Sequence, residues 1–159
     1  FANAPGPLPL LRQNGLRFAS GKLQERSLRD LDPAELTTLF ERYNVRWVLC
    51  WSDEAKESFA QAPPPVAFVA AFENFALYRI DRAGSFFVKG SGDVQAEPNA
   101  ITVTNASAQD DTIVLRYHWN AKLKVPAPLE LFPYEVLGDP LPFIGVRRPT
   151  SSFRITFDF

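Results

Sequence analysis

Apolar and polar positions recur with two different periods along this chain, and the period changes near residue 82. Before that point, apolar residues twice recur at helical spacing, and each helical stretch leads into a run of apolar residues. After it, apolar and polar residues alternate one by one in short runs, as they do in β-strands. The pattern therefore predicts two regions, an α/β region over residues 1–82 and an all-β region over residues 83–159.

The first helix is predicted by its start signal and by an apolar stripe. Asp32 stands at the N-cap position, Pro33 follows at the first helical position, and Glu35 lies three residues after the cap. The stripe at positions i, i+3, i+4 and i+7 consists of Leu36, Leu39, Phe40 and Tyr43. We expect this helix to end at residue 43 or 44, where a β-branched valine begins the next element.

Residues 45–51 follow as a nearly continuous apolar run, which predicts a strand buried on both faces. Ser52 and the two acids after it start a second helix, because serine caps a first turn and acids favour the positive end of the helix dipole. Three prolines at residues 63–65 end that helix.

Two more strands are predicted at residues 66–72 and 75–80, joined by a turn at Glu73 and Asn74 in which the asparagine can adopt a positive φ. If the strands at 45–51 and 66–72 share one sheet and run parallel, the helix between them is a crossover connection. The first region is therefore expected to form a small mixed βαββ layer.

The second region holds short strands separated by turns rich in Gly, Pro and Asp, about ten residues apart, which is the spacing of a β-sandwich. In the run 112–119, Ile113 and Leu115 alternate with Val114 and Arg116, which predicts a half-buried strand. The other predicted strands span residues 85–89, 100–104, 123–125, 129–132, 143–147 and 153–159. The chain as a whole is predicted to be α+β, with the βαββ layer followed by an antiparallel, jelly-roll-like β-sandwich.

Composition narrows the classes of function. The net charge is −1 with both signs mixed along the chain, so we expect no nucleic-acid partner. The longest apolar run, residues 66–72, is far shorter than the roughly 18 residues that cross a bilayer. The chain starts at Phe1 and contains no Met, so we expect it to be a domain of a larger protein. The single cysteine, Cys50, lies in an apolar run and is expected to be a small core residue.

Candidate chemistry is sparse. The only histidine, His118, lies within a predicted strand, and a structural role is favoured over that of a catalytic base. One cysteine and one histidine cannot form a structural zinc site. Four acids of the second region are expected to lie in solvated turns rather than to bind Ca²⁺: Asp93, Glu97, Asp110 and Asp111. We therefore predict no catalytic residue, no metal site, no cofactor and no enzymatic activity in this chain.

Aromatic side chains of the second region are the candidate ligand-binding residues. Sugar rings stack their C–H surfaces on flat aromatic faces, and the residues considered for this role are Tyr117, Trp119, Phe132 and Tyr134. The alternative is that these side chains fill the core of the sandwich, as aromatic residues commonly do.

Two segments resemble a family of large bacterial multi-pass membrane proteins. Residues 43–49, Tyr-Asn-Val-Arg-Trp-Val-Leu, follow a helix and precede a short helix and a hairpin that contains Tyr78 and Arg79. This order resembles a segment of YfhO-type proteins and related C-type glycosyltransferases, which use lipid-linked sugar donors. Residues 113–119, 142–149 and 153–159 are similar to the all-β module that follows in that family, although Asn-Ala-Lys replaces the family's Pro-Gly-Trp at residues 120–122.

The resemblance implies a role as well as a fold. In such proteins the catalytic acids lie in loops among the membrane spans, so this chain would be the soluble C-terminal domain on the extracytoplasmic side. The expected function is that of a non-catalytic accessory domain, linked to glycosyl transfer or cell-envelope polysaccharide, with the membrane-embedded remainder of the parent protein as partner and a glycan or polypeptide as ligand. The alternative is an independent carbohydrate-binding or protein-interaction module of a secreted protein.

Overall fold

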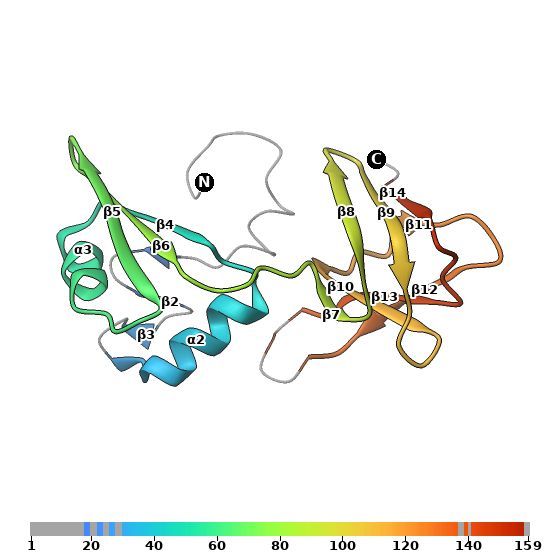
Figure 1. Ribbon diagram of the computed structural model, residues 1–159, viewed down its shortest axis with the longest axis horizontal. Coiled ribbons are helices and arrows are strands. Elements are labelled where there is room, and N and C mark those ends of the chain that lie inside the picture. The colour runs from blue at the N-terminus through green and yellow to red at the C-terminus, as the bar shows by residue number, and fades with distance from the viewer. Residues whose placement is uncertain are drawn as a thin grey trace. The chain divides into compact units, whose positions relative to one another are not determined.

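The computed structural model describes residues 18–19, 22–23, 26–27, 30–136, 139 and 141–157 (Figure 1). The chain forms two compact units, Phe1–Gly84 and Ser85–Phe159. Antiparallel β-sheet dominates the described residues, and each unit has a hydrophobic core of its own.

The first unit contains both described helices. Its elements in chain order are β1 (Phe18–Ala19), β2 (Lys22–Leu23), β3 (Arg26–Ser27), α2 (Pro33–Arg42), β4 (Trp47–Cys50), α3 (Asp53–Ala60), β5 (Val66–Phe72) and β6 (Phe75–Ile80). The first three strands form a small sheet of their own in the order β1-β2-β3, and the last three form a second sheet in the order β4-β6-β5.

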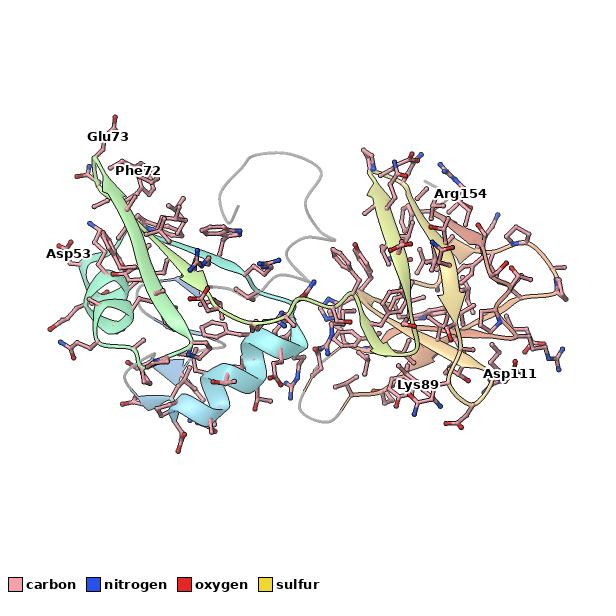
Figure 2. All side chains as sticks on the ribbon, in the orientation of Figure 1. Asp53, Phe72, Glu73, Lys89, Asp111 and Arg154 are labelled. Carbon is pink, nitrogen blue, oxygen red and sulfur yellow. The ribbon has the colours of Figure 1, made fainter. Side chains whose placement is uncertain are left out.

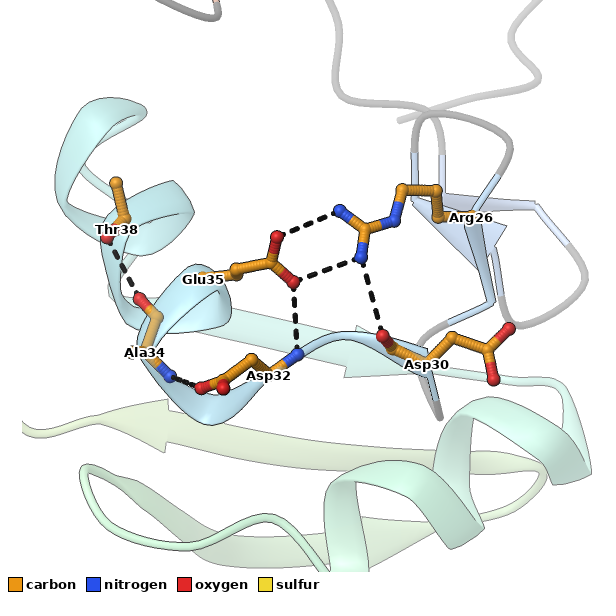
Figure 3. A network of polar contacts seen from close by, with 6 residues as sticks. All are labelled: Arg26, Asp30, Asp32, Ala34, Glu35 and Thr38. Carbon is orange, nitrogen blue, oxygen red and sulfur yellow. Dashed lines mark hydrogen bonds and ion pairs between the residues drawn. The ribbon is translucent and has the colours of Figure 1, made fainter.

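The start of α2 matches the capping signal in the sequence. The Asp32 carboxylate accepts a hydrogen bond from the Ala34 backbone N–H at 2.7 Å, and the Glu35 carboxylate accepts one from the Asp32 N–H at 3.1 Å. Arg26 of β3 also donates to both Glu35 oxygens, at 3.0 and 3.1 Å (Figure 3). These bonds fix the first turn of α2 and connect it to the small β1-β2-β3 sheet.

Strand β6 is the centre of the second sheet and runs antiparallel to both of its neighbours, β4 and β5. The strands β4 and β5 therefore run in the same direction, on opposite sides of β6, and are not hydrogen-bonded to each other. One face of this sheet packs on the helices. Its core cluster consists of Phe40, Val48, Cys50, Phe59, Ala76, Tyr78 and Ile80.

The prediction that residues 45–51 form a strand buried on both faces is wrong. Exposure alternates along β4, where Val48 and Cys50 are buried while Trp47 is 54% and Leu49 45% exposed. The helices α2 and α3 contribute to the core on one face of the sheet, whereas these two side chains on the other face stay about half exposed. In the β5–β6 turn the residue with positive φ is Glu73 (φ 50°), not the predicted asparagine.

The second unit contains two four-stranded antiparallel sheets. Its elements are β7 (Phe87–Lys89), β8 (Ser91–Glu97), β9 (Ala100–Ser107), β10 (Thr112–His118), β11 (Leu123–Lys124), β12 (Glu130–Tyr134), β13 (Phe143–Arg147) and β14 (Phe153–Phe157). The strand orders are β12-β13-β10-β7 and β11-β14-β9-β8. Side chains of both sheets form one core: Phe87, Val103, Ile113, Leu115, Ile144, Val146, Phe153 and Ile155. Residues 158 and 159 of the predicted last strand lie outside the described residues.

Strand β10 is more deeply buried than its alternating pattern predicts. Ile113 and Leu115 face the core as expected, but Val114 on the other face is also fully buried. Val114 lies opposite Gly145 of β13, and the Phe132 ring of β12 covers this glycine. The prediction of a half-buried strand is therefore wrong at this point, because side chains of the neighbouring strands cover the outer face of the sheet.

Strand β8 was not predicted, because its residues are mostly polar or small. It pairs with β9 along nearly its whole length. Gly90 just before it adopts φ +83°, and a Cβ on this residue would lie 2.8 Å from the Ser107 carbonyl oxygen. The glycine therefore permits the close turn from β7 into β8.

Candidate functional site

The exposed face of the β4-β6-β5 sheet is the most prominent apolar surface of the described residues. Across this face Leu49 lies opposite Leu77, and Phe72 lies opposite Phe75. Trp51 continues the alternation of β4 one residue beyond its end. We call these side chains, with Trp47, the apolar face: Trp47, Leu49, Trp51, Phe72, Phe75 and Leu77. Four of them are about half exposed, namely Trp47, Leu49, Trp51 and Phe72.

A charged side chain, Arg79 of the central strand β6, lies on the same face of the sheet as Leu77 and Trp47. Arg79 lies opposite Trp47 on the sheet, and its guanidinium donates to both carboxylate oxygens of Asp81, at 2.5 and 3.2 Å. This hydrogen bonding holds the pKa of the Asp81 carboxyl below its usual value. The pair therefore stays ionised at neutral pH and adds no net charge. Glu73 lies beside Phe72 at the tip of the β5–β6 hairpin (Figure 2).

The helices of this unit carry an excess of acidic residues. Five acids and two bases lie on α2 and α3, which gives a net charge of −3: Glu35, Glu41, Asp53, Glu54 and Glu57 against Arg42 and Lys56. Both helices contribute to the core on the side of the sheet that faces away from the apolar face. The helix side of the unit is thus acidic, although Phe68, which is 61% exposed, lies opposite the core residue Tyr78 on that side. Arg46 also lies close enough to Asp81 to lower the pKa of its carboxyl.

The four aromatic residues considered for ligand binding do not come together. Phe132 and Tyr134 lie on the outer face of the β12-β13-β10-β7 sheet, with their rings edge to face and 6.4 Å apart. Tyr117 instead packs against the core and stacks on Phe86 at 6.1 Å, and burial raises the pKa of its hydroxyl. Trp119 follows β10, and its backbone N–H donates to the Pro142 carbonyl at 2.8 Å.

The Phe132 ring is engaged within the protein by two residues of β13. A Cβ added to Gly145 would lie within 2.7 Å of three ring carbons, so the ring rests directly on the backbone of β13. The Arg147 guanidinium lies over the ring, 4.6 Å from its centroid, in a cation–π contact. Within this pair, Tyr134 is therefore the better placed to stack on a ligand.

His118 has an acidic neighbour that the sequence did not reveal. The Nε2 atom of His118 lies 3.5 Å from Oδ1 of Asp139, and the two side chains are 11% and 1% exposed. The same Oδ1 accepts a hydrogen bond from the Leu141 N–H at 3.0 Å, and the imidazole packs against the Phe143 ring at 5.3 Å. A Gly-Asp-Pro sequence at 138–140 signals a turn, but it gives no indication that the aspartate is enclosed.

The remaining candidates for chemistry are placed as follows. Cys50 is buried, and burial raises the pKa of its thiol to about 11, so the reactive thiolate is scarce at neutral pH. Asp93 and Glu97 lie on β8 rather than in turns, while Asp110 and Asp111 form the turn before β10 with positive φ. Among the described residues, no group of three His, Cys, Asp or Glu side chains could hold a metal ion, and no helix is long and apolar enough to cross a membrane.

Comparison with known proteins finds no family model, no curated protein and no solved structure that matches this chain. Function is therefore inferred from the residues of this chain.

Proposed function

We propose that this chain is a non-catalytic accessory domain on the extracytoplasmic side of a bacterial membrane protein linked to glycosyl transfer or cell-envelope polysaccharide. The proposal takes up the resemblance of residues 43–49 and of the all-β segments to YfhO-type proteins and related C-type glycosyltransferases. We also propose that the strands of the second unit are connected as in a jelly roll. The membrane-embedded remainder of the parent protein would be the partner.

The observation that carries the proposal is the apolar face. Leu49 and Trp51 are exposed, whereas the groups capable of acid–base or nucleophilic chemistry, such as Cys50 and Asp139, are enclosed. Catalysis requires a base within reach of a substrate, and binding requires exposed surface that water covers poorly. A domain with this distribution is better suited to hold a partner than to transform a substrate.

Two measurements test the role and the location. The natural reading frame upstream of Phe1 is expected to encode several apolar segments of about 20 residues; a lone signal peptide there would contradict the proposal. Alkaline phosphatase fused after Phe159 in the full-length protein is expected to be active, because this reporter needs disulfides that form outside the cytoplasm. An inactive but stable fusion would place the domain on the wrong side of the membrane.

A second candidate function, glycan binding by an independent module, is favoured by one observation. Tyr134 packs beside Phe132 on the outer face of its sheet, where a sugar ring could stack on it. Titration of the chain with cell-envelope oligosaccharides would test this idea. Binding that falls about tenfold in Tyr134→Ala, but not in Tyr43→Ala of the first unit, would favour the module; equal binding by both variants would argue against it.

A further inference from the structure

We propose that the apolar face of the first unit docks on the surface of a lipid bilayer, with Trp47, Leu49 and Trp51 inserted among the headgroups. The inference deepens the proposed function and rests on it for the presence of a membrane. It names lipid as the partner of this face, with the helices α2 and α3 turned toward water.

The area of the face is that of a binding surface. Four large side chains that are each about half exposed offer roughly 400 Å² of apolar surface. This is as large as the apolar patches that proteins use for binding.

The residue types favour the boundary between lipid and water. Trp47 and Trp51 lie at the two ends of β4, and Leu49 lies between them on the same face. Tryptophan concentrates at membrane interfaces, because its ring is apolar while its indole N–H can bond to headgroups and water. A shallow position also leaves the outer backbone edge of β4 near water, as unpaired N–H and C=O groups require.

The distribution of charge on the first unit determines which of its sides faces the bilayer. Arg79 on this face is paired with Asp81, whereas α2 and α3 together carry a net charge of −3 on the other side of the sheet. An acidic surface is repelled by anionic lipids, so the helices are expected to face away from the bilayer. Attraction to lipid must then come from apolar contacts, and it should depend little on salt.

The experiment is flotation of the chain with vesicles of phosphatidylcholine alone, and of phosphatidylcholine mixed with phosphatidylglycerol. We expect the native chain to float with both kinds of vesicle at low and high salt, and its tryptophan emission to shift to shorter wavelength. The variant Leu49→Ser/Trp51→Ser is expected to bind at least about tenfold more weakly. Val88→Ser, which changes an exposed apolar side chain of the second unit, is the matched control and should bind like the native chain.

Three results would overturn the proposal. The first is no flotation of the native chain in excess lipid. The second is equal flotation of the native chain, the double variant and a further face variant, Phe72→Ser. The third is a concentration-dependent dimer in sedimentation that the face variants abolish, because the face would then bind a second copy. Failure of flotation together with an active phosphatase fusion would remove the lipid partner and leave the proposed function standing.

Discussion

The two units cover their β-sheets in opposite ways. In the first unit, two helices cover one face of a three-stranded sheet, and Leu49 on the other face is 45% exposed. In the second unit, two sheets share a core, and even the outer face of one sheet encloses Val114 and Phe143. An apolar strand thus has one face exposed in the first unit, whereas the central residues of β10 are buried on both faces in the second. The comparison indicates that the first unit has the larger exposed apolar surface available for a partner.

The largest effect is expected from the same substitution made in both units. Leu115 of β10 is fully buried, and Leu115→Ala should lower the free energy of unfolding by about 3 kcal/mol, through lost contacts and a cavity. Leu49→Ala on the exposed side of β4 should cost about 0.5 kcal/mol or less. Urea unfolding followed by circular dichroism measures both. Equal losses would show that the two strands are buried to the same extent.

The glycine beneath Phe132 gives the next test. In Gly145→Ala the new Cβ would lie 2.4 Å from the ring, so the ring must move, and we expect a loss of stability of about 2 kcal/mol. In the background of Phe132→Ala the ring is absent, and the same change should cost much less. A double-mutant cycle from urea unfolding measures this coupling. Additive losses would contradict the close contact between β12 and β13.

The pH dependence of the first unit follows from Cys50. Its pKa is raised from 9.0 to about 11 by burial, so the neutral thiol favours the folded state. This stability is fully present below pH 9 and is lost as the pH rises toward 11, by about 1.4 kcal/mol at pH 10. Unfolding free energies at pH 8 and pH 10 should therefore differ less in Cys50→Ala. An unchanged slope would assign the loss to another group, such as Tyr78, whose pKa is also raised by burial.

The smallest effect is expected at the start of α2. Asp32→Ala removes the acceptor for the Ala34 N–H and should cost about 1 kcal/mol. Asp32→Asn keeps an acceptor at the cap and should cost only a few tenths. Thermal unfolding by circular dichroism distinguishes the two variants. If the two variants lose the same free energy of unfolding, the negative charge of Asp32 rather than its hydrogen bond to the Ala34 N–H stabilises the helix.

Local signals made much of the fold predictable. The capping box placed α2, and a short run of mainly apolar residues gave the bounds of β13 at residues 143–147. These local patterns gave wrong predictions where the burial of a strand depends on residues far away in the sequence. The apolar run in β4 does not reveal that helices pack on only one side of its sheet. The polar composition of β8 gives no strand signal, and β8 is a strand because it pairs with β9. Asp139 and His118 come together from separate parts of the sequence, and no spacing in the sequence records this proximity.

The position of β6 between β4 and β5 also has a consequence for synthesis. As the nascent chain leaves the ribosome, β4 emerges well before β6, its partner strand among the described residues, which ends at Ile80. Until β6 has emerged, Val48 and Cys50 have no completed sheet to join, and an apolar strand with free edges is prone to wrong pairing. A pause in translation after β4 has left the ribosome but before β6 has done so would therefore lengthen the interval in which this strand is vulnerable to aggregation, whereas a pause after Ile80 has emerged would not.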